Sequence, residues 1–385
     1  MKENKLIIAA AGSGKTTRLV VDAFNRNGNV LITTFTDENE AEIYEKFISK
    51  YGFVPEHVTI QTWFSFLLQH GIRPYQGTCY SELFDKRIKS IYFVESIGGV
   101  KYYRKVFGKK IPVLYKEEEE FMQHYFTDDM SIYTDKLAKF VIRANKKSKG
   151  EVINRISRIY PTIFIDEVQD LAGYDLEIVK ELFHNNSTVV CVGDPRQVTY
   201  YTHLEKKHSA YKNGMFKDYV LNVCHKSDQI VIDEISLSSS HRNNKPICDF
   251  SSRIYPAFPV SVPCNCESCH PLNVEHQGVF IVKESDLDHY LEKYNPVQLR
   301  HNVKIKTQSN YSSCNFGKSK GKTYQRVLIY PTKDIKEWLK DNSKDLKDKT
   351  RAGFYVAVTR ARFSVAFVIP DAECSNFQGI EVWEN

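Results

Sequence analysis

Long apolar stretches are missing from this sequence of 385 residues. No uninterrupted apolar run approaches the roughly 18 residues that a membrane-spanning helix needs, so the sequence predicts no transmembrane anchor. It also has no convincing internal repeat or low-complexity tract. Glycine and proline are infrequent, at 18 and 13 residues, whereas 42% of the residues are hydrophobic. This composition excludes a collagen-like or disordered chain and predicts two or three folded units with substantial cores.

A disulfide framework is a second absence. The nine cysteines are odd in number and are not distributed in such a pattern, which favours reduced thiols in a cytoplasmic protein. A secretory signal is not predicted either, because the apolar run from Leu6 to Ala11 is short and leads directly into a glycine-lysine loop. We interpret that run as a buried strand.

Charge of one sign does not dominate, since the formal net charge is only +6. Its local distribution is more informative, because an acidic run covers Glu117 to Glu120 and a basic stretch lies further along the chain. A solvated face is the simpler interpretation of both segments, and a phosphate-contacting surface is the alternative for the basic one. The basic stretch comprises Lys139, Arg143, Lys146, Lys147, Lys149, Arg155 and Arg158.

Short apolar runs bounded by polar turns predict the strands. Several are apolar throughout, which is typical of a parallel sheet covered on both faces. Helical patterns separate them, one after Lys15 and another after the cap region Thr36 to Asp37. Such alternation predicts an α/β fold with two parallel-sheet lobes. The predicted strands begin at Leu6, Val30, Thr162, Thr188, Val279, Arg326 and Ser364, and one face of the second helix is expected to carry Ile43, Tyr44, Phe47, Ile48 and Tyr51.

The predicted strands fall into two groups, before and after about residue 215. Residues 75–150 lack a strand rhythm and carry charged and aromatic patterns compatible with helices. The sequence therefore predicts a first lobe made of residues 1–74 and 151–215, interrupted by a helical insertion at 75–150. The second lobe is predicted to cover residues 216–385.

The segment AAAGSGKTT, Ala9 to Thr17, follows a predicted strand and opens a predicted helix. In this context successive backbone N–H groups cradle phosphate oxygens. Lys15 would reach the β and γ phosphates and the Thr16 hydroxyl would bind Mg²⁺, while Ala9 stands where the general pattern has its first glycine. The predicted ATP-binding residues are Ala11, Gly12, Ser13, Gly14, Lys15, Thr16 and Thr17.

The segment IFIDEVQDL, Ile163 to Leu171, is an apolar strand that ends in adjacent carboxylates. Asp166 is predicted at the carboxyl edge of the sheet, beside the phosphate loop, where it can hold Mg²⁺. Glu167 can then polarise the attacking water. Taken alone, such an acidic pair also fits a solvated turn or a helix cap.

Several further motifs follow in a fixed order, and with them the chain resembles the superfamily 1 helicases of the UvrD/Rep/PcrA type. The resemblance spans nearly the whole chain and implies two RecA-like lobes that use ATP and Mg²⁺. It implies movement along single-stranded or tailed duplex DNA from 3′ to 5′. The motifs are AAAGSGKTT, ITTFTDENEAEI, VTIQTWFSF, FIDEVQDL, VVCVGDPRQVTY, LSSSHRNN, NFGKSKGKTYQRVLI and FYVAVTRAR.

The resemblance assigns further residues to ATP hydrolysis. Gln197 in GDPRQ matches the glutamine that senses the γ phosphate, and Arg242 and Arg360 match the two arginines that reach the γ phosphate across the lobe cleft. A guanidinium that arrives only on lobe closure would couple hydrolysis to motion. Either arginine alone would fit a surface salt bridge. The predicted catalytic residues are Lys15, Asp166, Glu167, Gln197, Arg242 and Arg360.

The resemblance also assigns contacts with single-stranded DNA. Aromatic faces stack on bases without reading the sequence, which suits a motor. Core packing is the alternative for each aromatic residue and is the stronger one for Trp63 and Phe64, which lie among other apolar residues. The predicted contacts are Phe35, Thr62, Trp63, Tyr200, Lys318 and Lys320.

The chain also departs from this family. Only eight residues precede Ala9, so the upstream glutamine that recognises adenine is not expected, and Gly317 stands where many relatives have a DNA-contacting histidine. The segment between Arg242 and Gly317 is too short for the large accessory domain of full-size relatives. That segment contains CNCESCH, whose ligand types suit zinc although all of them crowd into one loop. The candidate zinc ligands are Cys264, Cys266, Cys269 and His270.

Three functions are therefore weighed. The first is an ATP-driven single-stranded DNA translocase or helicase. The second is a nucleotide- and DNA-sensing subunit that controls a partner such as a nuclease, because compact members of the family occur in anti-phage systems of the Gabija type. The third is a DNA-binding protein with an inactive ATPase, which the complete set of catalytic residues disfavours.

Overall fold

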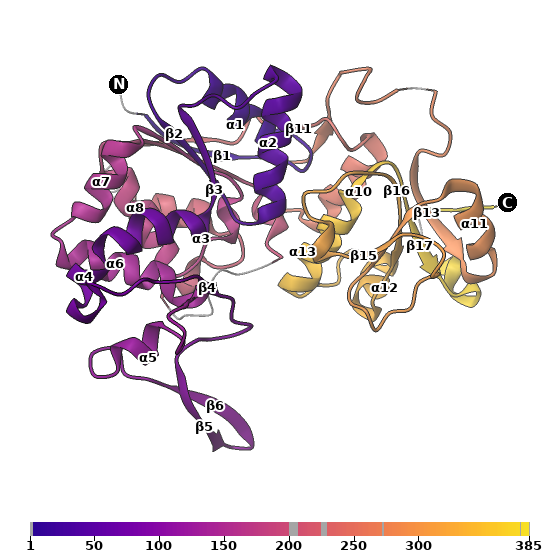
Figure 1. Ribbon diagram of the computed structural model, residues 1–385. Helices are drawn as coiled ribbons and strands as arrows, with labels where there is room; N and C mark the ends of the chain where they lie inside the picture. The colour runs from indigo at the N-terminus through magenta and orange to yellow at the C-terminus, as the bar shows by residue number, and fades with distance from the viewer. Residues whose placement is uncertain (1–2, 200–206, 225–228, 272, 378, 385) are drawn as a thin grey trace. The chain divides into compact units, whose positions relative to one another are not determined.

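The computed structural model describes residues 3–199, 207–224, 229–271, 273–377 and 379–384 (Figure 1). Its internal contacts divide the chain into two compact units. The first comprises Met1–Leu6, Thr16–Val192 and Tyr201–Ile232, and the second comprises Ile7–Lys15, Gly193–Tyr200 and Asp233–Asn385. The chain leaves the first unit for the last time after Ile232, later than the predicted boundary at residues 215 and 216. Within the described ranges, no helix is both long and apolar enough to cross a membrane.

A six-stranded sheet lies in the first unit, in the order β10, β1, β9, β8, β2, β3. Strand β2 pairs in parallel with β3 and β8, and β8 pairs in parallel with β9. The edge strand β10 explains the shifted boundary, because this strand lies after residue 216 and belongs to the first sheet. The strands are β1 Asn4–Ile8, β2 Val30–Thr34, β3 Val58–Thr62, β8 Thr162–Ile165, β9 Thr188–Gly193 and β10 Ile230–Asp233.

Two helices of the first unit, α1 and α2, begin where the sequence predicted them. Thr36 caps α2, since its hydroxyl accepts a hydrogen bond from the Asn39 N–H at 3.2 Å. The predicted apolar face of α2 is partly wrong, because Ile43 and Phe47 are buried while Ile48 is 53% exposed. These helices are α1 Lys15–Phe24, α2 Asp37–Tyr51, α3 Trp63–Phe66, α4 Gln76–Cys79, α5 Phe121–Tyr125, α6 Leu137–Lys147, α7 Glu151–Ile159, α8 Tyr174–His184 and α9 Phe216–Tyr219.

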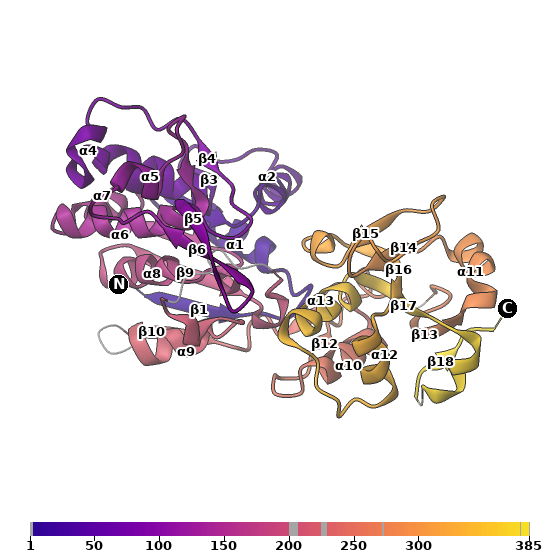
Figure 2. The ribbon, with the colours of Figure 1, turned by 90° about the horizontal axis from the view of Figure 1, so that it is seen from below.

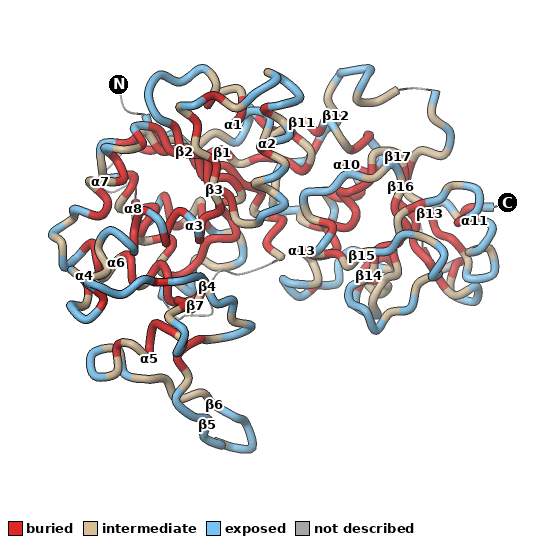
Figure 3. Tube along the Cα trace, viewed as in Figure 1, coloured by how far each residue is buried: buried red, intermediate tan, exposed pale blue. Residues whose placement is uncertain are grey.

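The sequence predicted a helical insertion at 75–150, but the structure shows both helices and strands in this segment. Its middle forms an antiparallel hairpin of β5 Val100–Val106 and β6 Lys109–Leu114, and β4 Ile91–Tyr92 pairs with β7 Ile132–Tyr133. Figures 1 and 3 show the hairpin extending away from the helices of the first unit, with its surface exposed. Because neither strand of the hairpin buries a residue, neither carries the apolar run that identified the other strands.

A second six-stranded sheet lies in the second unit, in the order β15, β14, β16, β17, β13, β18, and all its pairs are parallel. The three predicted strands, β16, β17 and β13, are adjacent in this sheet, whereas the shorter strands β14, β15 and β18 escaped prediction. The strands are β13 Gly278–Lys283, β14 Val297–Arg300, β15 Ser313–Asn315, β16 Tyr324–Tyr330, β17 Ala361–Ile369 and β18 Glu381–Val382. A separate pair joins β11 Ser239–Ser240 to β12 Val262–Pro263.

Both faces of this second sheet are covered, as the apolar runs predicted. Along β16, Val327 and Ile329 belong to one core while Leu328 between them belongs to another. The first core includes residues of α10 Lys245–Ile254, α12 Lys333–Lys340 and α13 Asp348–Val358, and the second includes residues of α11 Leu287–Tyr294 (Figure 2). Two six-stranded sheets with helices make this an α/β protein, consistent with two RecA-like lobes.

Candidate nucleotide and nucleic-acid site

The predicted phosphate loop lies between the end of β1 at Ile8 and the start of α1 at Lys15. Gly12 and Gly14 have φ angles of 70° and 82°, a left-handed conformation that favours glycine. A Cβ atom on Gly12 would lie 2.6 Å from the Arg242 Cβ, so only glycine fits without a shift. The Ser13 hydroxyl is buried and has no hydrogen-bond partner in the described part of the chain. A narrow backbone cradle with an unsatisfied donor fits a phosphate group.

The proposed magnesium ligands lie beside each other in the first unit. The Thr16 hydroxyl, in the first turn of α1, donates to the Asp166 Oδ2 at 3.4 Å. Asp166 follows β8 and is 4% exposed, and its backbone N–H donates to the Thr33 carbonyl at 2.8 Å. A hydroxyl and a carboxylate oxygen are donors that Mg²⁺ prefers, so these two residues fit the ion.

Glu167 adopts an unusual backbone conformation. Its φ of 55° is in the left-handed region, where a residue with a side chain is strained. Its N–H donates to the Asp166 Oδ1 at 2.9 Å, and its carboxylate accepts a hydrogen bond from the Gln169 amide. These contacts orient both carboxylates after β8, where the sequence predicted them.

Gln197 and Arg360 contact each other directly. The Arg360 guanidinium donates to the Gln197 Oε1 at 3.1 Å, and the Gln197 amide donates to the Asp194 Oδ2 at 2.9 Å. Arg360 is only 2% exposed, so a surface salt bridge does not describe it. Arg242 is half-buried and donates to the Thr359 carbonyl at 3.2 Å. The structure therefore gathers Gln197, Arg242 and Arg360 within the second unit.

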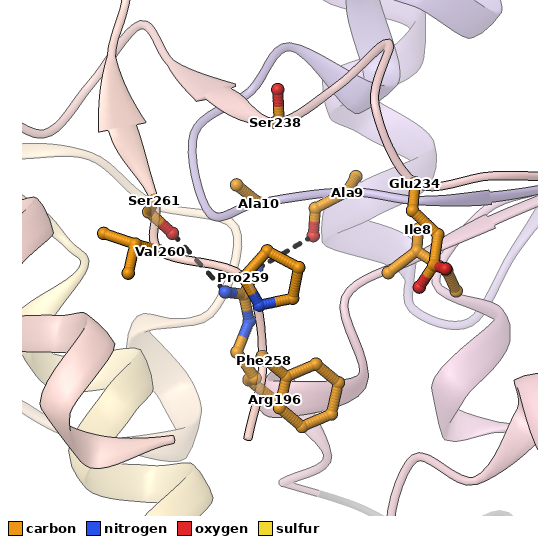
Figure 4. Close-up of a pocket in the computed structure, with 10 residues that line it drawn as sticks. All are labelled: Ile8, Ala9, Ala10, Arg196, Glu234, Ser238, Phe258, Pro259, Val260 and Ser261. Carbon is orange, nitrogen blue, oxygen red and sulfur yellow. Dashed lines mark hydrogen bonds between the residues drawn. The ribbon is translucent and has the colours of Figure 1, made fainter. Parts of the chain in front are cut away.

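Arg196 was missed by the sequence analysis, although it stands between Asp194 and Gln197 in GDPRQ. Its guanidinium donates to Asp194 Oδ1 at 2.7 Å, to the Ala9 carbonyl at 3.2 Å and to the Ser261 hydroxyl at 3.4 Å. Figure 4 shows the last two bonds beside a small pocket lined by Phe258 and neighbouring residues. Burial lowers the pKa of Arg196, but the Asp194 carboxylate outweighs it and raises that pKa above its usual range. Arg196 thus joins the start of the phosphate loop to the second unit's 258–261 segment.

Two residues predicted to contact DNA are buried in the structure. Trp63 is 1% exposed, and its indole N–H donates to the Asp175 carboxylate at 2.7 Å. Thr62 is buried and caps α3, where its hydroxyl accepts from the Ser65 N–H at 3.3 Å. Both side chains are therefore held by contacts within the protein, which favours the core-packing alternative for Trp63.

The remaining predicted DNA contacts differ in their accessibility. Phe35 is half-buried and packs edge-on against Phe64, with 5.4 Å between ring centroids. Lys318 is exposed and Lys320 is half-buried. Tyr200 lies outside the described residues. Phe35 and Lys318 thus retain exposed surface that is accessible to a DNA strand.

The basic stretch and the acidic run pair with each other. Lys139 contacts Glu117 at 2.8 Å, and Arg143 contacts Glu117 at 3.0 Å and Glu118 at 2.6 Å. Burial raises the pKa of Glu117, but hydrogen bonds from Lys139 and Tyr125 outweigh it and lower that pKa to about 2. The pairing neutralises part of the basic stretch, which weakens its interpretation as a phosphate-contacting surface.

The hairpin β5–β6 offers another surface that the sequence analysis missed. Residues 100–114 contain five cations and no acidic residue. Tyr102 and Tyr103 are 55% and 58% exposed, and Phe107 at the turn is fully exposed. Cations interleaved with exposed aromatic rings are typical of surfaces that bind single-stranded nucleic acid.

His270, the predicted histidine ligand of the cysteine loop, uses one of its two ring nitrogens to contact the protein backbone. The His270 Nε2 lies 3.0 Å from the Ser240 carbonyl, so that nitrogen donates a hydrogen bond to the backbone. All nine cysteines are in the described part of the chain and are free thiols.

Comparison with known proteins supports part of the resemblance. Residues 99–203, less than half of the chain, match the family model described as UvrD/REP helicase N-terminal domain, which confirms the resemblance to this family over that segment. Comparison with curated proteins finds no match.

Solved helicase structures are similar at low sequence identity. Arterivirus nonstructural protein 10, a helicase, is 15% identical with a TM-score of 0.44, and the match covers 98% of this chain and 62% of that one. The complex of arterivirus nonstructural protein 10 with DNA matches at 15% identity and a TM-score of 0.43, covering 98% and 63%. The helicase of PRRSV matches at 13% identity and a TM-score of 0.43, covering 97% and 54%. This chain spans less than two thirds of the length of each.

Proposed function

We propose that this protein is an ATPase that moves along single-stranded DNA, in the manner of a 3′ to 5′ superfamily 1 helicase. The observation that carries the proposal is the contact of Thr16 with Asp166 beside a glycine cradle, at the ends of the strands where the motif order places them. The match of residues 99–203 to the UvrD/REP family supports the same class.

The residues divide the work of phosphoryl transfer. The backbone of the loop at 9–14 and the Lys15 ammonium would hold the β and γ phosphates, and Thr16 and Asp166 would hold Mg²⁺. When bound, Mg²⁺ neutralises charge on the transferred phosphoryl group. Glu167 would accept a proton from the attacking water, because its carboxylate is oriented by Gln169.

Gln197 and Arg360 would couple the reaction to movement. Because the two side chains share a direct hydrogen bond, a movement of one would change the position of the other. Charge that develops on the γ phosphate would draw a guanidinium toward it. Arg242 would act with them, since it is held on the Thr359 carbonyl next to Arg360.

Single-stranded DNA would contact Phe35, Lys318 and the hairpin β5–β6. Rings would stack on bases and lysines would neutralise phosphates, neither of which requires a particular sequence. This set replaces Trp63 and Thr62, which are buried.

The test compares ATP hydrolysis with and without single-stranded DNA, for the natural chain and for Lys15→Ala and Glu167→Gln. We expect DNA to stimulate hydrolysis, and Glu167→Gln to lower the rate by about 10²- to 10⁴-fold because general base catalysis is lost. Tailed duplexes of both polarities then separate unwinding from translocation alone.

Absence of stimulation by DNA, together with an unchanged rate in Glu167→Gln, would overturn the motor. ATP binding without hydrolysis would instead support a nucleotide-sensing subunit, and co-purification with a nuclease would identify its partner.

A further inference from the structure

The cysteine loop folds back on the segment that carries Arg242. Strand β11 pairs in parallel with β12, which leads directly into the loop. The Cys264 N–H then donates to the Ser240 carbonyl at 2.9 Å, and the His270 ring contacts the same carbonyl. This backbone pairing brings the loop next to His241, a residue that the sequence analysis did not connect with it.

Three ligand atoms from two segments converge here. The ligand atoms of His241, Cys264 and Cys269 all lie within 4.8 Å of one another. The distance from the His241 Nδ1 to the Cys269 Sγ is 3.7 Å. A tetrahedral zinc ion with a Zn–S bond of about 2.3 Å and a Zn–N bond of about 2.0 Å separates its sulfur and nitrogen ligands by about 3.5 Å. The observed spacing therefore suits one ion with little movement of either side chain.

Cys266 is the candidate for the fourth ligand and would add a third thiol. It precedes Cys269 by a spacing of Cys-x-x-Cys, which is typical of zinc knuckles. The Cys266 carbonyl accepts hydrogen bonds from the N–H groups of Cys269 and His270 at 3.0 and 3.1 Å, which forms a tight turn. Its thiol is exposed and contacts the Ser268 hydroxyl at 3.0 Å, so it can rotate without leaving a core.

We propose that His241, Cys264, Cys266 and Cys269 form a structural zinc site. Soft thiolates with one imidazole select zinc rather than magnesium or calcium. His241 replaces His270 as the histidine ligand, and because it comes from a separate segment it removes the strain of closing the tetrahedron within one loop.

The ion would fix the loop to both arginine segments. The backbone N–H of His241 donates to the Gly12 carbonyl at 2.8 Å, and Arg242 is the next residue. On the other side, the Arg362 guanidinium donates to the Cys269 carbonyl at 3.0 Å, two residues after Arg360. The zinc site itself does not depend on the proposed motor, whereas this effect on the arginines does.

The test measures zinc per chain in the full-length protein, purified under reducing conditions and freed of loosely bound metal. We expect one zinc per chain, and we expect His241→Ala and Cys269→Ser to lower zinc content at least tenfold. His270→Ala and Cys314→Ser are the matched controls, since neither removes a proposed ligand, and both should keep the ion.

Replacement of zinc by cobalt gives a second measurement, which can be made on the natural chain and on Cys266→Ser. Thiolate-to-cobalt charge-transfer absorption should appear, and it should weaken in Cys266→Ser if that thiol is the fourth ligand. If His241→Ala does not fold, release of zinc from the natural chain by a chelating dye still decides the question.

A chain that holds no zinc, or zinc content equal in His241→Ala, Cys269→Ser and the controls, would overturn the site. Because metal content is measured without ATP or DNA, an inactive ATPase that keeps its zinc would refute the motor and leave the site intact.

Discussion

The phosphate loop and the cysteine loop are both short turns that follow a strand, and both contact the segment that carries His241 and Arg242. They differ in what they offer a ligand. The predicted phosphate loop would offer a ligand its backbone, which the positive φ angles of Gly12 and Gly14 shape into a tight turn. The cysteine loop presents side chains, and one of its proposed ligands, His241, comes from another part of the chain.

This difference explains why the sequence predicted all the residues of the phosphate loop but only some of the proposed ligands of the cysteine loop. A cradle of consecutive N–H groups is encoded by the residues that form it. A tetrahedral side-chain site needs ligands from any segments that the fold brings together, and here the pairing of β11 with β12 does so. The predicted histidine ligand, His270, is close to the cysteines in the sequence, whereas His241 is close to their thiols in the structure.

Gly12→Ala should break the phosphate loop and have the largest effect. The substitution combines a left-handed φ with a contact of 2.6 Å to the Arg242 Cβ. Gly52→Ala is the matched control, since Gly52 has a φ of 81° and its Cβ would meet no atom within 4 Å. We expect the control to lose about 1–2 kcal/mol of stability and to keep its ATPase activity.

Gly12→Ala should lose more stability than the Gly52→Ala control, and its ATPase rate should fall more than tenfold. Thermal unfolding and ATP hydrolysis of both variants check this. Equal behaviour of the two variants would show that the close approach of Arg242 does not shape the loop.

Arg196→Lys should weaken both loops at once, with an intermediate effect. Lysine can keep the ion pair with Asp194, but it cannot also hold the Ala9 carbonyl and the Ser261 hydroxyl. Loss of these buried hydrogen bonds should cost about 1–3 kcal/mol of stability. Chemical denaturation measures this, and ATP affinity and zinc retention should fall together. A change in only one of them would mean that the loops respond independently.

Glu117→Gln should have the smallest effect on either loop, because Glu117 lies in the insertion. Its pKa is lowered to about 2 in the folded protein, so its charge stabilises the fold above the unfolded pKa of about 4.5. That stabilisation is lost as the pH falls from about 4.5 towards 2.

The variant should therefore be less stable than the natural chain near neutral pH, and the difference should vanish near pH 2. Denaturation curves across this range measure it. A difference independent of pH would exclude the Glu117 carboxylate as its source.

The strands show how far pattern alone reaches. All seven apolar runs are strands, because a strand covered on both faces must be apolar along its length. The exposed hairpin β5–β6 has no such requirement and carried no signal. Strands β10, β14, β15 and β18 are short, so they too escaped prediction.

Single side chains were harder to predict than strands. Trp63 matched a DNA-contacting position, yet its environment is decided by Asp175, which is far away in the sequence and accepts the indole N–H. In the same way, Lys139 and Arg143 looked like a free basic surface until the fold placed Glu117 against them.

The sequence by itself determined the α/β architecture, the phosphate loop and the carboxylates after β8, because each depends on residues that are consecutive in the chain. Only the tertiary structure decided that Trp63 is buried, that Arg196 joins two segments and that His241 faces the cysteines. Contacts between distant segments depend on how strands pair and where loops fold back, and no local pattern records them.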